Sequence, residues 1–201
     1  MKRYFIIAFL FLSSCVSSSK VSIVPRSELI ELSKKEKIPY KTILVQWKNY
    51  KYSDYHKVNY LEKTPEDVLP AEVDEKDYKN FKKKVINIFR ENGLYDEVNG
   101  TGTVKISLIT YGRWDYSELF STYLVDTGYV LLLPSSITVT YRMTVKAEQN
   151  GKEAKLQNES SVKTTFFFLL FPLYPFSTFS GSEKTVLNNM IYKTAVDLSK
   201  S

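Results

Sequence analysis

The chain has 201 residues, and its 28 lysines and arginines exceed its 22 aspartates and glutamates to give a formal net charge of +6. It contains one cysteine and one histidine, which excludes an internal disulfide and disfavours the usual zinc sites. A chain of this length fits a single domain, whose stability must come from its hydrophobic core.

The first fifteen residues have the pattern of an export signal. Met1-Lys2-Arg3 supplies positive charge, Tyr4 to Leu12 is an apolar run, and Leu12-Ser13-Ser14-Cys15 follows it with small residues and a cysteine. The apolar run has about nine residues, whereas a helix needs about 20 to cross a bilayer. We therefore expect this segment to be removed and not to serve as a permanent anchor.

The sequence Leu12-Ser13-Ser14-Cys15 resembles the lipobox of bacterial lipoproteins. The resemblance implies a signal peptide over residues 1–14, a diacylglycerol on the sulfur of Cys15, and membrane association through that lipid. Val16 stands where an aspartate would retain lipoproteins of enteric-type bacteria at the inner membrane, so the resemblance implies the cell envelope and its outer membrane.

Residues 15–40 are mostly polar, with Ser17, Ser18, Ser19 and Lys20 soon after the cysteine. This composition predicts a tether. One short turn of helix is expected within it, around Leu29, Ile30 and Leu32. The remainder, residues 41–201, is expected to form a single α/β domain.

The first strand is predicted over residues 42–47, which are β-branched and apolar. After an irregular connection, a helix is predicted between Asp74 and Gly93, because apolar residues recur there at spacings of three and four. Asp74 or Asp77 is expected to cap its start, and Gly93 to end it. We interpret the helix's basic residues as a solvated face and not as a site: Lys79, Lys82, Lys83 and Lys84.

Three more strands are predicted from alternating apolar and polar residues. They cover residues 103–111, 137–146 and 154–165, and Asn150-Gly151 between the last two favours a tight hairpin turn. A final helix is predicted after Ser180, where Ser180-Gly181-Ser182-Glu183 has the spacing of a capping box. Its core face should hold Val186, Leu187, Met190, Ile191, Thr194 and Leu198.

The order β-α-β-β-β-α predicts an α+β fold, with a mainly antiparallel sheet of about four strands and two helices on one face. The first two strands flank a helix and should run parallel. This order of elements is similar to that of small α/β envelope lipoproteins, including the curli-secretion lipoprotein and the activators of penicillin-binding proteins.

No catalytic site is predicted, and the protein is not expected to be an enzyme. His56 lies in a tyrosine-rich stretch, and the sequence has no Gly-x-Ser-x-Gly elbow and no glycine-rich phosphate loop. Carboxylates that could pair in space are better explained as solvated acids: Asp115 with Glu118, and Glu62 with Asp67. No cofactor and no metal are expected.

Two apolar runs, residues 129–134 and 166–176, flank the predicted hairpin. A turn at Asn150-Gly151 brings them to the same edge of the sheet. Two interpretations stay open, because the runs can fold back into the core or form an exposed end that contacts lipid, a ligand or a partner. The predicted contact residues are Leu131, Leu132, Leu133, Phe168, Leu169, Leu170, Phe171, Leu173 and Phe176.

Three functions remain. The first is a membrane-anchored binding or scaffold lipoprotein, and the second is a carrier of an apolar molecule, with a cavity lined by Phe166, Phe168, Tyr141 and Met143. The third is a hydrolase with an unrecognised site. The expected partners are the membrane, through lipid on Cys15, and an envelope protein. Nucleic acid is not expected, because an exported protein does not meet it. The sequence does not determine the oligomeric state.

Overall fold

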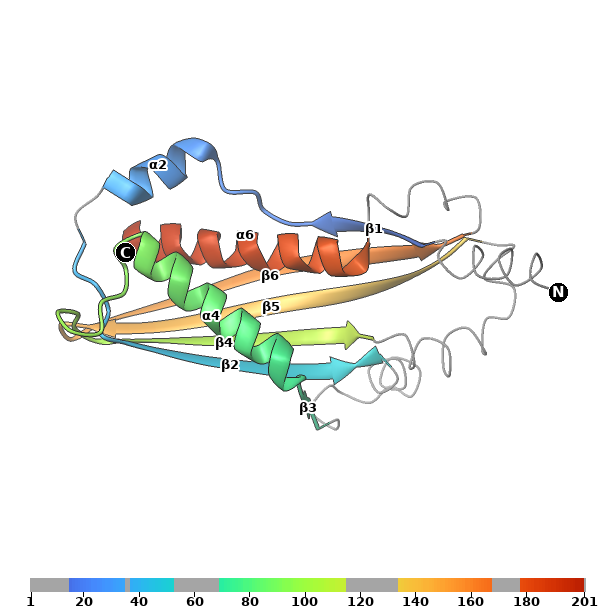
Figure 1. Ribbon diagram of the computed structural model, residues 1–201, viewed down its shortest axis with the longest axis horizontal. Coiled ribbons are helices and arrows are strands. Elements are labelled where there is room, and N and C mark those ends of the chain that lie inside the picture. Colours follow the sequence, from blue (N-terminus) through green and yellow to red (C-terminus); the bar gives the residue numbers. More distant parts are fainter. Residues whose placement is uncertain (1–14, 35–36, 53–68, 115–133, 168–177, 201) are drawn as a thin grey trace.

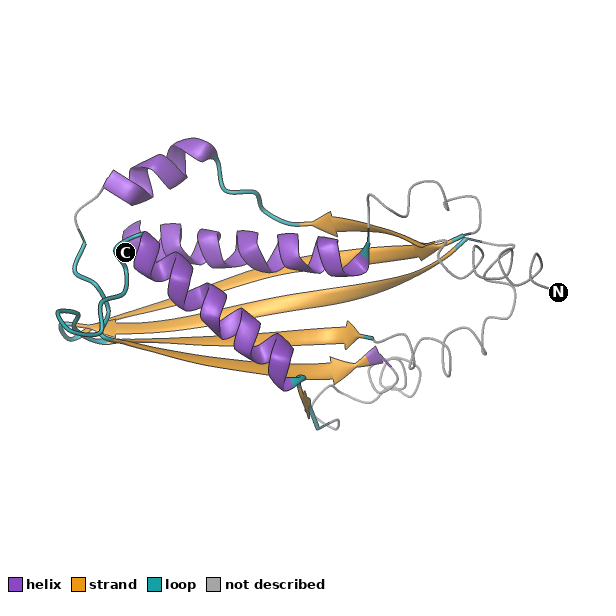
Figure 2. Ribbon diagram, in the orientation of Figure 1, coloured by secondary structure: helices purple, strands orange, loops and turns teal. Residues whose placement is uncertain are grey.

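The computed structural model describes residues 15–34, 37–52, 69–114, 134–167 and 178–200. Within these ranges the chain forms a six-stranded sheet in the order β1-β6-β5-β4-β2-β3, together with three helices (Figures 1 and 2). Helices α4 and α6 lie across one face of the sheet, and α2 lies beside α6. The α+β class is as predicted, with two more strands and one more helix than expected.

The elements have the following bounds: β1 Cys15–Lys20, α2 Arg26–Lys34, β2 Thr42–Lys51, β3 Ala71–Glu72, α4 Glu75–Glu91, β4 Thr103–Arg113, β5 Ser135–Gln149, β6 Lys152–Phe166 and α6 Phe179–Lys200. Strands β2 and β4 pair in parallel, as predicted from the helix between them, and all the other strand pairs are antiparallel.

The core forms between the sheet and the helices because the strands alternate strictly. In β5, Val139, Tyr141 and Met143 have no exposed surface, whereas Thr138 and the other alternate residues point to the opposite face. Helix α4 adds Phe81, Val85, Ile88 and Phe89 to the core. The described helices do not cover the outer face of the sheet, which is polar, as is common for antiparallel sheets.

The predicted hairpin turn and the predicted caps of α4 are confirmed. Asn150 and Gly151 have φ angles of 53° and 75°, which the tight hairpin turn requires. The carboxylate of Asp74 accepts hydrogen bonds from the backbone N–H groups of Lys76 and Asp77 at the start of α4. Gly93, with φ 68°, follows the end of that helix.

The segment expected to be a tether contains packed elements. Strand β1 pairs antiparallel with β6, and its buried Ser17 hydrogen-bonds the Thr164 hydroxyl at 2.8 Å. Helix α2 buries Leu32 against the core. The polar composition wrongly indicated a tether, because a strand at a sheet edge places only every second side chain toward the core. A serine can occupy such a buried position when its hydroxyl is hydrogen-bonded.

The predicted capping box of α6 is wrong. The helix begins at Phe179, and the Thr178 hydroxyl accepts a hydrogen bond from the Gly181 N–H at 3.2 Å. Glu183 therefore lies inside the first turns, where its carboxylate turns inward and pairs with Arg113. The predicted core face of the helix is confirmed, since all six of its residues are buried.

Candidate functional site

A β-bulge at the end of β4 positions the first component of the site. Strands β2 and β4 pair in register as far as Tyr50 and Tyr111, and then Lys51 pairs with Arg113, so that Gly112 is the extra residue. Gly112 has φ 75°, which favours glycine. Because the extra residue reverses the alternation of the strand, Arg113 points to the helix-covered face.

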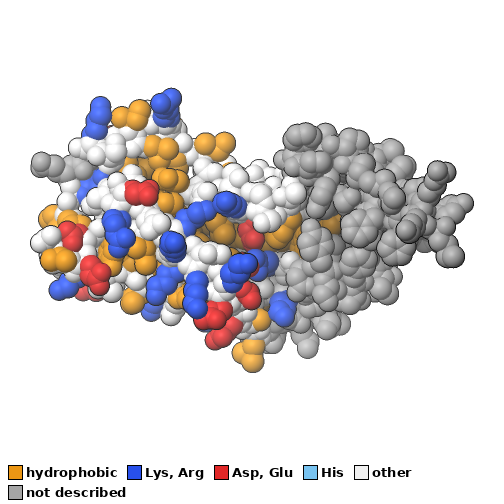
Figure 3. All heavy atoms as spheres, viewed as in Figure 1, with side chains coloured by type: hydrophobic (Ala, Val, Ile, Leu, Met, Phe, Trp, Pro, Cys, Tyr) orange, Lys and Arg blue, Asp and Glu red, His pale blue; other side chains and the backbone are white. Residues whose placement is uncertain are grey.

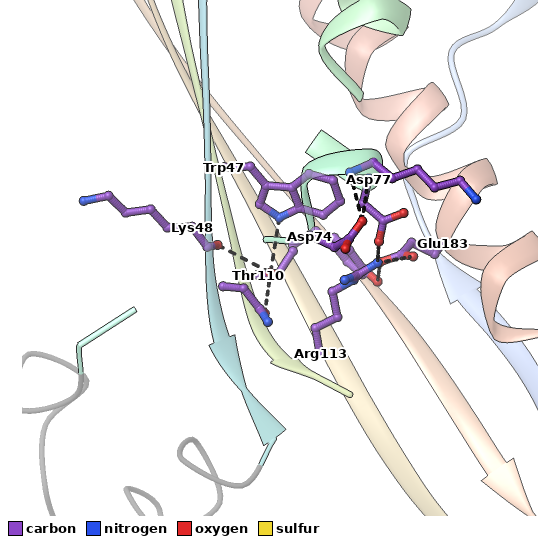
Figure 4. Close-up of polar contacts among 10 residues, drawn as sticks. Trp47, Lys48, Asp74, Asp77, Thr110, Arg113 and Glu183 are labelled. Atoms are coloured by element: carbon purple, nitrogen blue, oxygen red, sulfur yellow. Dashed lines mark hydrogen bonds and ion pairs between the residues drawn. The ribbon is translucent and has the colours of Figure 1, made fainter. Parts of the chain in front are cut away.

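Arg113 joins the sheet to both large helices (Figure 4). Its Nε donates to Glu183 Oε1 of α6 at 2.8 Å, and its Nη2 donates to Asp77 Oδ2 of α4 at 2.5 Å. The Tyr141 hydroxyl of β5 also donates to Glu183 Oε1, at 2.9 Å. The side chains of Arg113 and Glu183 are only 19% and 12% exposed. We call these four residues the Arg113 cluster.

Arg113 and Tyr141 keep fixed protonation states near neutral pH. Burial acts to lower the pKa of Arg113, but the hydrogen bonds and charges of Glu183 and then Asp77 outweigh burial and raise it. Burial, followed by the charge of Glu183, raises the pKa of Tyr141 well above 10.0. The guanidinium therefore stays charged and the phenol stays neutral. Such fully partnered groups hold the sheet and the two helices together.

Trp47 of β2 lies beneath the guanidinium. Its ring centroid is 5.3 Å from Arg113 Cζ and 5.2 Å from the ring centroid of Phe81. The indole Nε1 donates to the Thr110 hydroxyl at 3.3 Å, and that hydroxyl donates to Asn49 Oδ1 at 2.7 Å. These bonds fix the orientation of the indole (Figure 4).

A groove of about 620 Å³ lies between α4 and α6, with the Arg113 cluster at the end where both helices begin. Its apolar lining comes from Trp47, Phe81, Ile88 and Leu187. The rest of its lining is mostly polar or charged: Asn80, Lys83, Lys84, Asn87, Glu91, Ser180, Lys184, Asn188 and Tyr192. Figure 3, which views this side of the molecule, shows basic side chains gathered around apolar surface.

Three lysines of the groove form no ion pair among the described residues, although the carboxylate of Glu91 also lines the groove. These lysines are Lys83, Lys84 and Lys184. Burial, and after it the positive charge of Lys184, lowers the pKa of Lys84. The two helices therefore bring like charges together, an arrangement that a bound anion would relieve.

Asn188, which lines the groove, has a side-chain oxygen that the described residues leave unsatisfied. Asn188 Oδ1 is buried and has no hydrogen-bond partner within the described ranges. A buried acceptor without a hydrogen-bond partner lowers the free energy of unfolding by about 1–3 kcal/mol. A ligand that carries anionic oxygens would relieve the like charges of the groove.

The predicted contact residues lie outside the residues that the structure describes, as do His56 and the four candidate carboxylates. The strand ends that flank the two apolar runs do meet, because Ser135 pairs with Phe166. Phe166 is buried, and its ring packs on that of Trp114 with centroids 5.8 Å apart. Tyr141 and Met143, expected to line a carrier cavity, are packed in the core.

The sequence interpretation missed the residues of the groove. Lys83 and Lys84 were assigned to a solvated face, yet they line the groove. Arg113 was not singled out at all. Gly112 was the available signal, because an isolated glycine within an alternating strand suggests a bulge that re-aims the next side chain.

Comparison of the chain with protein-family models, with curated proteins and with solved structures finds no match. In the described part of the chain, none of the helices combines the length and the apolar character that spanning a bilayer requires.

Proposed function

We propose that the protein is an envelope lipoprotein, held on the outer membrane by lipid on Cys15, and that its domain is a non-catalytic binding module. The observation that carries the proposal is Leu12-Ser13-Ser14-Cys15. The apolar run of Tyr4 to Leu12 before this motif and the positive charge of Lys2 and Arg3 support it.

The groove between α4 and α6 is the proposed binding surface, and its proposed occupant is an acidic segment of an envelope protein. Carboxylates of such a segment would face Lys83, Lys84 and Lys184. A polypeptide suits this groove better than an acyl chain does, because charged side chains and carboxamides line an open surface. An acyl chain gains most where apolar walls remove it from water.

A scaffold role is favoured over catalysis by the chemistry of the Arg113 cluster. Each of its charged groups has a partner, and the raised pKa values of Arg113 and Tyr141 keep both groups protonated near neutral pH. The cluster fixes α4 and α6 on the sheet, and so it sets the width of the groove between them.

Metabolic labelling with a fatty-acid probe tests the anchoring. We expect the wild-type protein to be labelled and to fractionate with the outer membrane. The Cys15→Ala variant should be unlabelled and keep its signal peptide, because lipid transfer precedes cleavage in the lipoproteins that the lipobox resembles. Equal labelling of the two proteins would refute the proposal.

A further inference from the structure

The loop between α4 and β4 presents negative charge and an apolar side chain to solvent. It spans residues 92–102 and leads into β4 at Thr103 (Figure 1). Asp96 and Glu97 in this loop form no ion pair with any residue that the structure describes. Val98, which follows them, is 82% exposed.

Asp96 holds residues 96–99, which we call the acidic loop, in one conformation. Its carboxylate accepts hydrogen bonds from the backbone N–H groups of Val98 at 2.8 Å and Asn99 at 3.0 Å, and from the side-chain amide of Asn99 at 3.0 Å. These bonds, that of the Asn99 side chain first, lower the pKa of Asp96 and keep the carboxylate charged near neutral pH. The Asp96 N–H donates to the Tyr40 carbonyl at 3.1 Å and ties the loop to the chain before β2. A loop fixed in this way loses little conformational freedom when it binds.

A second acidic pair lies near the hairpin turn, but its charge is balanced. Glu148 and Glu153 lie opposite each other in β5 and β6. Lys146 and Lys155 lie two residues from them on the same face of the sheet. The acidic loop has no such basic neighbour in the sequence, because residues 95–102 contain no lysine or arginine.

The groove between α4 and α6 has the opposite character. Lys83, Lys84 and Lys184 line it without ion pairs among the described residues, and part of its lining is apolar. The chain therefore carries both a basic groove and a preformed loop whose charge and exposed valine complement that groove.

We propose that the acidic segment that binds in the groove is the acidic loop of a second copy of this chain. Asp96 and Glu97 of one copy face the lysines of the other, and Val98 lies against the apolar part of the lining. This inference rests on the proposed function, because it names the partner of the groove described there. No residue of the loop lines the groove of its own chain, so the contact forms between copies.

This contact joins two different surfaces, so each copy offers one loop and one groove, and copies can be linked in series. A single loop buries a small area, and such a contact is weak between free molecules. Lipid anchors would confine the copies to one membrane and raise their effective concentration, which favours a weak contact.

The test uses acylated mature chains, purified from cells and mixed in vesicles of phosphatidylethanolamine and phosphatidylglycerol. Because Cys15 is the only cysteine and is the proposed lipid site, one reporter cysteine can be added to each chain. One chain carries Asn80→Cys on the groove wall, and a second chain with a different tag carries Val98→Cys. The matched control for the second chain is Lys152→Cys, which replaces another exposed residue. With oxygen and a copper catalyst, we expect several-fold more disulfide between positions 80 and 98 than between positions 80 and 152.

Charge reversal shows whether the disulfide reports the proposed contact. Glu97→Lys in the Val98→Cys chain should reduce the disulfide to the control level, and so should Lys84→Glu with Lys184→Glu in the Asn80→Cys chain. Mixing the two reversed chains should raise the disulfide above the control level again, which a misfolded variant could not do. Equal yields at positions 98 and 152, or no recovery in the reversed pair, would overturn the proposal.

Photocross-linking from position 80 in intact cells separates this inference from the function on which it rests. A photoreactive residue in place of Asn80 should capture the peptide that contains the acidic loop. Capture of an acidic segment from another protein, and not from this chain, would refute self-association and leave the groove as a binding surface. Capture of no acidic peptide at all would refute both proposals.

Discussion

Two arginines on opposite faces of the sheet have similar partners but different surroundings. On the helix-covered face, Arg113 lies over Trp47 and pairs with Glu183 at 2.8 Å. On the outer face, Arg142 lies 5.5 Å from the ring centroid of Tyr111 and pairs with Glu159 at 3.2 Å. The side chains of the outer pair are 42% and 52% exposed. The same contacts should therefore stabilise the protein to different degrees.

The two faces also differ in how their lysines are arranged. On the outer face, Lys105 of β4 lies opposite Lys146 of β5, and water surrounds both. In the groove, Lys84 is partly desolvated and is repelled by Lys184. The number of basic residues does not distinguish the two faces. The convergence of lysines without ion pairs among the described residues in a concave, partly buried place does, and this is why we propose the groove as the binding surface.

The largest expected effect is that of Arg113→Ala. Removing the guanidinium leaves Glu183 buried without its cation, which should lower the free energy of unfolding by about 3–5 kcal/mol. Arg142→Ala should cost less than about 1 kcal/mol, because its ion pair is exposed to solvent. Urea unfolding of the Cys15→Ser mature chain measures both values. Equal losses would show that the two faces do not differ as described.

The next effect concerns the core beneath α6. Met143 has no exposed surface, and Met143→Ala should lower the free energy of unfolding by about 2–4 kcal/mol through the cavity that it leaves. The neighbouring outer-face change Thr144→Ala should alter it by no more than about 0.5 kcal/mol. Thermal and urea unfolding check both variants, and a similar loss for each would contradict the assignment of faces.

These comparisons also explain what could be predicted from the sequence. Helix α4 and strand β5 could be predicted because each places apolar side chains toward the core and polar side chains toward water. That arrangement repeats every three to four residues in the helix and every two residues in the strand, so it is visible in the local sequence. Strand β1 could not be predicted, because it depends on pairing with β6, which is more than a hundred residues away. Tertiary contacts override the preference of a serine-rich segment for an open chain.

The groove was less predictable than the fold for a related reason. The orientation of Arg113 depends on one bulge residue, and the environment of Lys84 depends on where α6 lies relative to α4. Neither fact is local to the residue concerned. Lipid attachment at Cys15 stays a prediction, and it rests on a four-residue motif that is local to the residue concerned.

The smallest expected effect on stability is also the most informative about binding. The double variant Lys84→Glu, Lys184→Glu should change the free energy of unfolding by no more than about 0.5 kcal/mol, since neither lysine has an ion pair among the described residues. It should nevertheless remove partner binding, because it reverses the charge of the groove. A photoreactive residue in place of Asn80, on the wall of the groove, would report the partner by cross-linking in intact cells.

The matched control is Lys105→Glu, Lys146→Glu, which makes the same change in net charge on the outer face. We expect cross-linking to fall at least tenfold in the groove variant and to persist in the control. The cross-linked peptide should contain an excess of aspartate and glutamate. Loss of cross-linking in both variants would indicate a long-range charge effect, and a neutral or basic peptide would refute the proposed occupant.

NMR titration of Lys84 measures the charge repulsion in the groove independently of any partner. The single variant Lys184→Glu replaces a repelling charge by an attracting one, so it should raise the pKa of Lys84. The outer-face variant Lys105→Glu should leave the pKa of Lys84 unchanged.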